Sequence, residues 1–276
     1  MIIPVRDDQA GLDRCLEAVL RQDTGPGGFE VIVVDDGSRA ALRCVPGVRY
    51  LSQDQVGSYA ARNLGIAAAR GAVLAFTDAD CIPDPGWLAS ALAGLEGRDD
   101  VYLAGDIRFM ARRPGVPNVF ERYDSLTFLQ QRYLVEQRHF GATANLIVPA
   151  PLMARVGVFD ADLQSGGDGD WGTRARSLGV LGRFHASAVV FHPARASMAQ
   201  LRRKWRRVLG GFADLHTRSG GRAAYRAPTE IFPAGSWARI RALPLPTCVA
   251  VVAVALMLYL DRRVTWLALR AARSSR

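Results

Sequence analysis

Lysine is almost absent from this chain of 276 residues, since Lys204 is the only one. All the remaining residues counted as Lys or Arg are arginines. Cysteine is scarce as well. The four cysteines, Cys15, Cys44, Cys81 and Cys248, form no CxxC pair, and no histidines cluster beside them. The sequence therefore gives no sign of a zinc site. It predicts reduced, mostly buried thiols in a reducing compartment.

Acidic residues are nearly missing from the last third of the chain. Residues 195–276 hold 16 Lys and Arg against three Asp and Glu, whereas residues 1–194 hold 19 against 23. A genome that favours arginine explains the choice of Arg over Lys, but not the missing acids. The asymmetry indicates an acidic partner for the C-terminal part. Anionic lipid and nucleic acid are the candidates, and no nucleic-acid-binding module is recognisable, so we expect no nucleic acid.

A secretory signal peptide is not expected, because residues 1–10 combine a strand-like start with charge. One long apolar stretch occurs, Leu243–Leu260, which carries no charge over 18 residues. A helix needs about 20 apolar residues to cross a bilayer. Pro244 and Pro246 shorten the continuous run to Thr247–Leu260. The stretch is a candidate membrane segment, and a transmembrane or re-entrant segment, an interfacial helix and a buried core helix all stay open.

Short apolar runs alternate with amphipathic stretches through the first half. Residues 29–34 and 72–77 are expected to be strands, and residues 8–22 and 58–69 helices. This alternation predicts an α/β fold with a parallel sheet. Residues 116–138 are expected to be helical. We expect one domain over residues 1–218, a linker at 219–242, the candidate membrane segment at 243–260 and a basic tail at 261–276.

Two acidic motifs follow predicted strands. Asp35-Asp36 comes after residues 29–34, and Asp78-Ala79-Asp80 comes after residues 72–77. Ligands of parallel sheets bind beyond the carboxyl ends of the strands. Carboxylates gathered at one sheet edge repel one another unless a cation or donor groups compensate. A pair two residues apart suits a hard cation such as Mg²⁺ or Mn²⁺, shared with a substrate diphosphate.

Two further residues are candidates for chemistry. Asp168 lies in the glycine-rich segment 165–170, just before a predicted helix. A carboxylate near a helix N-terminus is stabilised as the anion, which suits a group that must accept a proton. A helix cap is the alternative role, and Asp170 competes for it. His192 follows a predicted strand at 189–191, where a neutral imidazole can ligate manganese, although a single histidine is more often structural.

Taken in order, these motifs resemble family 2 glycosyltransferases of the GT-A fold. The segments are IIPVRD at 2–7, VVDDGS at 33–38, ARNLG at 61–65, FTDAD at 76–80, GGDGDWGTR at 166–174 and VVFHP at 189–193. The resemblance covers residues 1 to about 210. It implies a GT-A α/β domain with a mainly parallel central sheet flanked by helices. A C-terminal basic and apolar helical segment would follow it here.

The resemblance assigns roles to matching positions. Pro4, Val5, Asp35 and Asp36 would surround the base and ribose of a nucleotide-diphosphate sugar, and Arg62 would lie near the nucleotide.

The remaining assignments concern the reacting groups. Asp78 would support the ribose, and Asp80 would ligate the Mn²⁺ or Mg²⁺ that bridges the diphosphate, with His192 near that metal. Asp168 would act as general base. The implied reaction is transfer of a sugar, with inversion, to an acceptor hydroxyl on a glycan, a lipid-linked sugar or a small molecule.

The chain departs from the family pattern at several positions, and only Met1-Ile2-Ile3 precede Pro4 where several more residues are typical. Arg6-Asp7 stands where Tyr-Asn is usual, and Gly167 stands where Glu is usual. Because of the missing Glu and the short first strand, a catalytically impaired, membrane-associated nucleotide-sugar binding protein remains an alternative. A nucleotidyltransferase is a second alternative, although residues 4–16 lack the glycine-rich phosphate loop that such enzymes usually carry.

The basic stretch at 200–218 surrounds Trp205 with arginines and Lys204. It is expected to be an interfacial helix that meets anionic lipid headgroups, or a contact for a diphosphate or lipid phosphate, with a solvated helix face as the alternative. Together with residues 243–260 it predicts an enzyme at the cytoplasmic face of the cell membrane, either peripheral or anchored by a single segment, and otherwise cytoplasmic.

Overall fold

The computed structural model describes residues 1–24, 27–43, 45–218, 230–232 and 235–274. The chain forms two compact units. Unit 1 consists of residues 1–108, 131–162 and 167–192. Unit 2 consists of residues 109–130, 163–166 and 193–276.

The first half of unit 1 is a parallel sheet with helical connections. Its elements are β1 (Ile2–Val5), α1 (Gln9–Val19), β2 (Val31–Asp36), β3 (Val48–Gln53), α2 (Ser58–Ala68) and β4 (Val73–Thr77). Strand β1 pairs in parallel with β2 and β4, and β2 pairs in parallel with β3. Strands β1 and β2 are buried over nearly their whole length, which is why they appear in the sequence as continuous apolar runs.

In the rest of the sheet, the strand pairs whose register is defined are antiparallel. It adds β5 (Ile82–Pro83), β6 (Tyr102–Met110), β7 (Asn145–Pro149) and β8 (Gly182–Pro193). The described strands lie in the order β3-β2-β1-β4-β7-β6-β8-β5. Strand β7 runs antiparallel to both β4 and β6, and β5 runs antiparallel to β8. The fold is thus a mixed α/β sheet. Its parallel half is as predicted, and apolar periodicity carries no information on the direction of the later strands.

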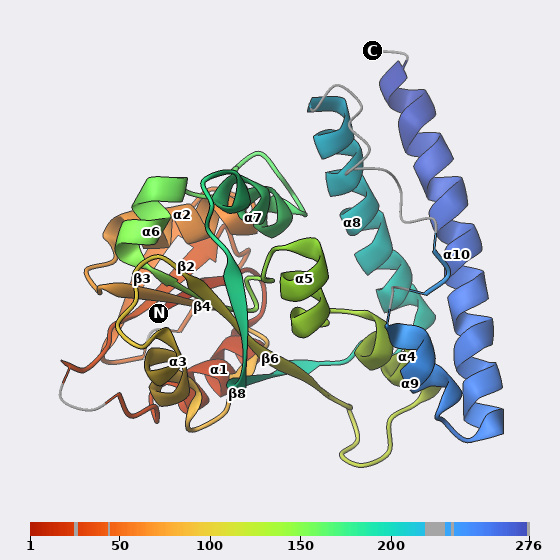
Figure 1. Cartoon of the computed structure of the whole chain (residues 1–276), viewed down its shortest axis with the longest axis horizontal. Coiled ribbons are helices and arrows are strands. Elements are labelled where there is room, and N and C mark those ends of the chain that lie inside the picture. The colour runs from red at the N-terminus through yellow and green to blue at the C-terminus, as the bar shows by residue number, and fades with distance from the viewer. Residues whose placement is uncertain (25–26, 44, 219–229, 233–234, 275–276) are drawn as a thin grey trace. The chain divides into compact units, whose positions relative to one another are not determined.

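Helices cover both faces of this sheet. Unit 1 also contains α3 (Trp87–Leu95), α5 (Gln131–Arg138), α6 (Ala150–Val156) and α7 (Gly167–Ser177). Figure 1 shows α2, α6 and α7 on one side of the sheet and α1 and α3 on the other. Helix α1 turns Leu12, Cys15, Leu16 and Val19 into the core, as the spacing of those residues predicts.

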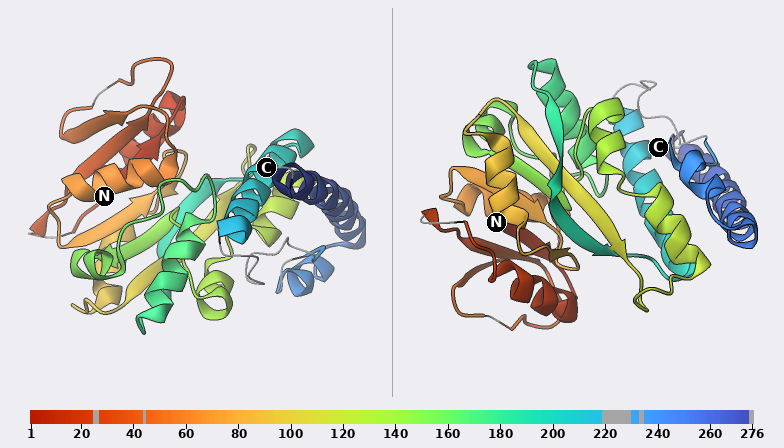
Figure 2. Two further views of the ribbon diagram at one scale, coloured as in Figure 1. Left: turned by 90° about the horizontal axis from the view of Figure 1, so that it is seen from above. Right: turned by 60° about the horizontal axis from the view of Figure 1, so that its bottom comes forward.

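Unit 2 is helical. It contains α4 (Val119–Thr127), α8 (Met198–Arg218), α9 (Ser236–Arg241) and α10 (Leu245–Ser274). Helices α8 and α10 lie side by side (Figures 1 and 2). Their shared core contains fully or nearly fully buried side chains from four helices: Tyr123, Leu201, Trp205, Ile240, Val251, Val254, Ala255 and Leu258.

Two expectations about helices need correction or completion. The helical stretch expected at 116–138 is divided into α4 and α5, because Phe128 is extended and Leu129 has a φ of 45°, which ends the helical hydrogen bonding. The apolar stretch at 243–260 forms only the first part of α10. By length and hydropathy Leu245–Leu269 is able to cross a membrane, a test that a core helix also passes.

Some expectations fall wholly or partly outside the described residues. Most of the expected linker at 219–242 does so, and its described part includes α9. Cys44 also lies outside them. Cys15 and Cys81 are buried and Cys248 is half-buried, as expected for cysteines that are mostly buried.

Candidate active site

The chain turns sharply where β4 ends. The amide nitrogen of Cys81 donates to the carbonyl oxygen of Asp78 at 3.0 Å, which closes a turn through Ala79 and Asp80. Strand β5 then pairs with β8 so that Ile82 lies opposite Phe191. One register position further along this antiparallel pair, Cys81 neighbours His192.

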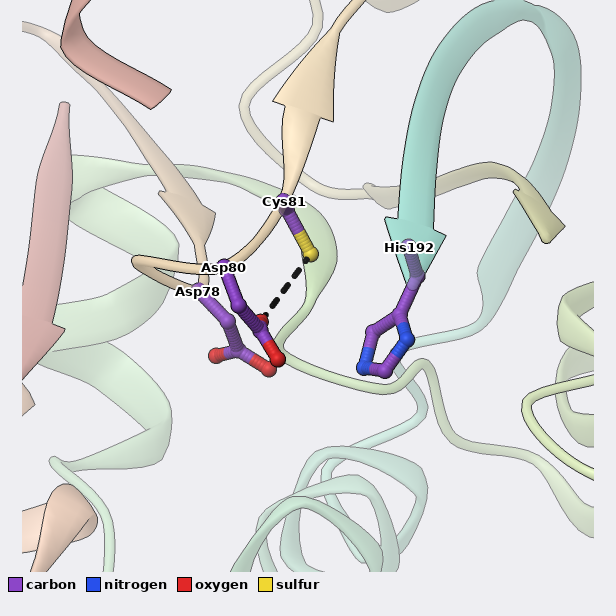
Figure 3. Close-up of side chains that lie close together, drawn as sticks. All are labelled: Asp78, Asp80, Cys81 and His192. Atoms are coloured by element: carbon purple, nitrogen blue, oxygen red, sulfur yellow. Dashed lines mark hydrogen bonds between the residues drawn. The ribbon is translucent and has the colours of Figure 1, made fainter. Parts of the chain in front are cut away.

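This turn and strand pair bring four potential ligands together. One ligand atom from each of Asp78, Asp80, Cys81 and His192 lies within 4.8 Å of the other three. Their side chains converge in Figure 3. Asp78 and Asp80 are half-buried, whereas Cys81 and His192 are buried. Two carboxylates, an imidazole and a thiol at this spacing fit a single divalent cation.

Sequence reasoning singled out Asp78, Asp80 and His192 but missed Cys81, which it interpreted as a packing residue. The Sγ atom of Cys81 donates to Oδ1 of Asp80 at 3.8 Å. Burial, together with the charges of Asp78 and Asp80, raises the pKa of the Cys81 thiol well above its usual range. Its position directly after the Asp78-Ala79-Asp80 triplet was the signal available in the sequence.

Arg62 lies against the acidic turn. It projects from α2, and its Nη2 atom donates to Oδ1 of Asp78 in a close ion pair. Its Nη1 atom donates to the carbonyl oxygen of Ser58 at 3.2 Å. Only 3% of Arg62 is exposed, so its charge needs a partner inside the protein. The ion pair with Arg62 therefore neutralises the charge of one of the carboxylates at this edge of the sheet.

Asp36 holds the connection between β3 and α2. Its Oδ1 atom accepts from Nε2 of Gln53 at 2.8 Å and from the amides of Val56 at 2.9 Å and Gly57 at 3.0 Å. Asp36 is buried. Three donors on one oxygen hold this carboxylate in place and fix the loop that precedes Arg62 in the chain.

The other residues assigned to a nucleotide pocket lie on adjacent strands. Pro4 and Val5 are buried in β1, and Val5 is the register partner of Asp35 in β2. Oδ1 of Asp35 accepts from the amide and the hydroxyl of Ser38 at 3.0 and 2.6 Å. Asp35 is half-buried. The carboxyl ends of β1 and β2 thus present Pro4, Val5 and Asp35 at one sheet edge.

Asp168 lies in the first turn of α7 and is half-buried. Its Oδ1 atom accepts from the amide of Gly169 at 3.0 Å and from the Tyr59 hydroxyl at 3.2 Å. Burial raises the pKa of Asp168, and these two hydrogen bonds and Arg62 oppose that rise. Asp170, the competing carboxylate, accepts instead from Nε of Arg174 at 3.0 Å.

Tyr59 is a site residue that sequence reasoning did not identify. It projects from α2 three residues before Arg62, whose guanidinium carbon lies 5.7 Å from the centre of its ring. A Cβ atom at Gly167 would come within 2.8 Å of that ring. The Tyr59 ring therefore takes the space that a side chain at position 167 needs. This accounts for a glycine where the family pattern leads us to expect Glu.

The arrangement resembles solved glycosyltransferases in its fold. A mannosyltransferase, PcManGT from Pyrobaculum calidifontis, in complex with GDP-Man and Mn²⁺, superposes with a TM-score of 0.58 at 18% identity, over 99% of this chain and 73% of that one. TarS 1–349 of S. aureus in complex with UDP-GlcNAc gives 0.54 at 17% identity, over 98% and 91%. These superpositions show that the mixed sheet has the GT-A fold.

Sequence comparison gives the family. The model of glycosyl transferase family 2 matches residues 1–152. Glycosyltransferase AglE of Haloferax volcanii is 34% identical over 215 residues, which cover 75% of this chain and 70% of AglE. The chain belongs to glycosyl transferase family 2, as its motifs led us to expect.

Proposed function

We propose that this glycosyltransferase moves a sugar from a nucleotide-diphosphate donor to an acceptor hydroxyl with inversion, and that Asp168 is the general base. The carrying observation is the environment of Asp168: a half-buried carboxylate with a raised pKa, held by Tyr59 and Gly169. A base with a pKa nearer neutrality takes a proton more effectively in the transition state than an ordinary aspartate does.

The proposed reaction is a single displacement. The acceptor oxygen forms a bond to the anomeric carbon while the bond from that carbon to the diphosphate breaks, and Asp168 takes the acceptor proton. Asp170 is held by Arg174, so Asp168 acts without a second carboxylate from its own turn. One displacement at the anomeric carbon inverts its configuration.

Asp80 and His192 are proposed to hold Mn²⁺ or Mg²⁺, which stabilises the negative charge that develops on the departing diphosphate. PcManGT, which shares the fold, binds Mn²⁺ together with GDP-Man. Asp78, paired with Arg62, is proposed to contact the ribose. Pro4, Val5, Asp35 and Asp36 are proposed to line the base and ribose pocket at the ends of β1 and β2.

Two substitutions in the same turn of α7 test the base. Asp168→Asn is expected to lower kcat by about a hundredfold to ten-thousandfold. Asp170→Asn removes an equal charge two residues away and is expected to keep kcat within about threefold, since its half-exposed ion pair is structural. The measurement is nucleotide release from a panel of UDP-, GDP- and dTDP-sugars with Mn²⁺. Undiminished transfer by Asp168→Asn refutes the assignment of the base. If the wild-type protein binds a nucleotide sugar but releases no nucleotide, it is a catalytically impaired binding protein.

Membrane association is proposed for unit 2. Helix α10 buries one face against α4 and α8, while large apolar side chains on its other faces are exposed: Leu245, Val249, Leu256, Met257, Leu260, Val264 and Leu267. Helix α8 exposes four arginines beside it, Arg202, Arg203, Arg206 and Arg207. An exposed apolar stripe next to a basic helix suits the surface of an anionic leaflet.

The packing of α10 on α8 favours an interfacial position over a span. Arg202 of α8 is paired with Asp261 of α10 at 2.6 Å. If α10 crossed the bilayer, α8 would carry its arginines towards the hydrocarbon, at a cost of at least about 2.5 kcal/mol for each one near the centre. We therefore propose that α10 lies along the cytoplasmic face, with its apolar stripe in the headgroup region.

A further inference from the structure

We propose that Cys81 is a metal ligand, and that the cluster of Asp78, Asp80, Cys81 and His192 consequently prefers a thiophilic divalent cation such as Co²⁺ or Zn²⁺ to Mg²⁺. The inference rests on the cation site of the proposed function and adds a sulfur ligand to it.

The position of the thiol is fixed by two independent constraints. The turn closed by the hydrogen bond from Cys81 to Asp78 places Asp78, Asp80 and Cys81 on three of its four residues. The pairing of β5 with β8 places Cys81 beside His192. Sγ of Cys81 lies within 4.8 Å of a ligand atom of each of the other three residues (Figure 3). Small side-chain rotations bring such a set around one ion.

The surroundings of this thiol are unlike those of a packing cysteine. Cys81 is 0% exposed, yet its sulfur contacts the carboxylate of Asp80 rather than only apolar side chains. When a cation binds, the thiol proton leaves to solvent and the sulfur bonds to the metal as thiolate. Thiolate ligands favour Zn²⁺ and other borderline cations, whereas Mg²⁺ takes oxygen ligands.

Cys15 provides a matched control. It is also a buried free cysteine of unit 1, and its Sγ atom lies close to the same turn. However, Cys15 donates to the backbone oxygen of Asp78 at 3.6 Å, and it is not part of the ligand cluster. A substitution there removes an equally buried thiol without removing a ligand.

The experiment is a Co²⁺ titration of the wild-type protein, Cys81→Ser and Cys15→Ser, followed by absorption spectroscopy. Wild type and Cys15→Ser are expected to develop the near-ultraviolet thiolate-to-cobalt charge-transfer band, and Cys81→Ser is expected to lack it. Competition with Zn²⁺ is expected to show affinity reduced about tenfold or more in Cys81→Ser. A wild-type protein without the band, or a band that persists in Cys81→Ser, overturns the proposal.

A wild-type measurement covers the case in which Cys81→Ser does not fold. X-ray absorption of the Zn²⁺-loaded protein is expected to show a sulfur neighbour at about 2.3 Å. A shell of nitrogen and oxygen alone overturns the thiolate assignment. Sugar transfer with Mn²⁺ is assayed in parallel: if transfer persists while the sulfur signal is absent, the proposed function stands and only the ligand role of Cys81 fails.

Discussion

At the scale of single residues, Tyr59 connects the two chemical parts of the candidate site. Its ring lies against the Arg62 guanidinium, which pairs with Asp78, and its hydroxyl donates to Asp168. Both Tyr59 and Arg62 are buried and stand three residues apart on α2, so they share one face of that helix. Helix α2 thereby fixes Asp78 at the sheet edge and Asp168 at the start of α7.

Tyr59→Phe is expected to shift the pH dependence of transfer. The hydroxyl stabilises the charged form of Asp168, so its loss raises the pKa of a carboxyl that burial has already raised. The proposed base, Asp168, acts when ionised, so activity is expected to fall as pH drops through this pKa. The acid limb of the kcat/KM profile should therefore move to higher pH in Tyr59→Phe. Tyr50→Phe, which removes a hydroxyl bonded to the amide of Val45, should leave the limb in place. An unmoved limb in Tyr59→Phe contradicts the role of Tyr59.

Lys204, the single lysine, occupies a site that suits an ammonium. It is almost fully buried, and its Nζ atom donates to Oδ1 of Asp124 at 2.8 Å and lies 3.6 Å from the centre of the Phe128 ring. Arg195 bonds the other carboxylate oxygen of Asp124 at 3.0 Å. These two cations lower the pKa of Asp124, while burial lowers the pKa of Lys204 to about 8.

Lys204→Met is expected to lower the free energy of unfolding by about 3–5 kcal/mol, because Asp124 stays buried with one of its two cations gone. Lys204→Arg is also expected to destabilise, since a larger guanidinium overfills the space between Asp124 and Phe128, at a cost of about 1–3 kcal/mol. Urea unfolding measures both. Arg203→Gln, at the exposed neighbouring position, is the control and should change stability by less than about 0.5 kcal/mol. A fully stable Lys204→Arg protein refutes the steric argument.

At the scale of elements, the sequence predicted those parts whose signal is local. The apolar run at 72–77 and the acidic triplet after it correspond to β4 and its turn, because a buried strand must end in something polar. The antiparallel pairing of β7 was not predictable, since an apolar run looks the same in either direction. The break at Leu129 was hidden within an amphipathic pattern that continues across it. Cys81 was missed as a candidate ligand because its neighbour His192 lies far away in the sequence. The pairing of β5 with β8 brings the two residues together.

Helix α10 carries a prediction for membrane binding. Leu260 is 63% exposed on the stripe that is proposed to enter the headgroup region. Leu260→Glu should weaken binding to vesicles containing phosphatidylglycerol by about tenfold or more, because an apolar side chain is lost and a like charge is introduced. Leu178→Glu changes net charge equally at another exposed leucine, in unit 1, and should bind as wild type does. Vesicle flotation is the measurement, and equal binding by all three proteins refutes the interfacial role of α10.

At the scale of the whole molecule, charge is divided along the chain, with the excess of arginine confined to residues 195–276. These residues all belong to unit 2, which also contains residues 109–130 and 163–166. Unit 1 lies entirely within the mildly acidic residues 1–194. Such a division favours binding of one unit to an anionic surface without drawing the other unit onto it.

Vesicle binding by the intact protein should therefore depend strongly on salt. Raising the ionic strength from about 0.1 M to about 1 M shortens the screening length from about 10 Å to about 3 Å. Binding to anionic vesicles is expected to fall steeply over this range, while binding to neutral phosphatidylcholine vesicles, which depends on the apolar stripe alone, should be weak and nearly constant. Sedimentation with the two kinds of vesicle measures this. Salt-independent binding to the anionic vesicles contradicts a role for the arginines.

The contact between Tyr59 and position 167 also restricts how this site can change over time. A glutamate at 167 collides with the ring as long as Tyr59 is present, whereas loss of the ring alone leaves Asp168 without its hydroxyl partner. Each single change towards the usual acidic pair is therefore expected to disturb the site. Among descendants of one ancestor, an aromatic side chain at 59 and a side chain at 167 should exclude each other.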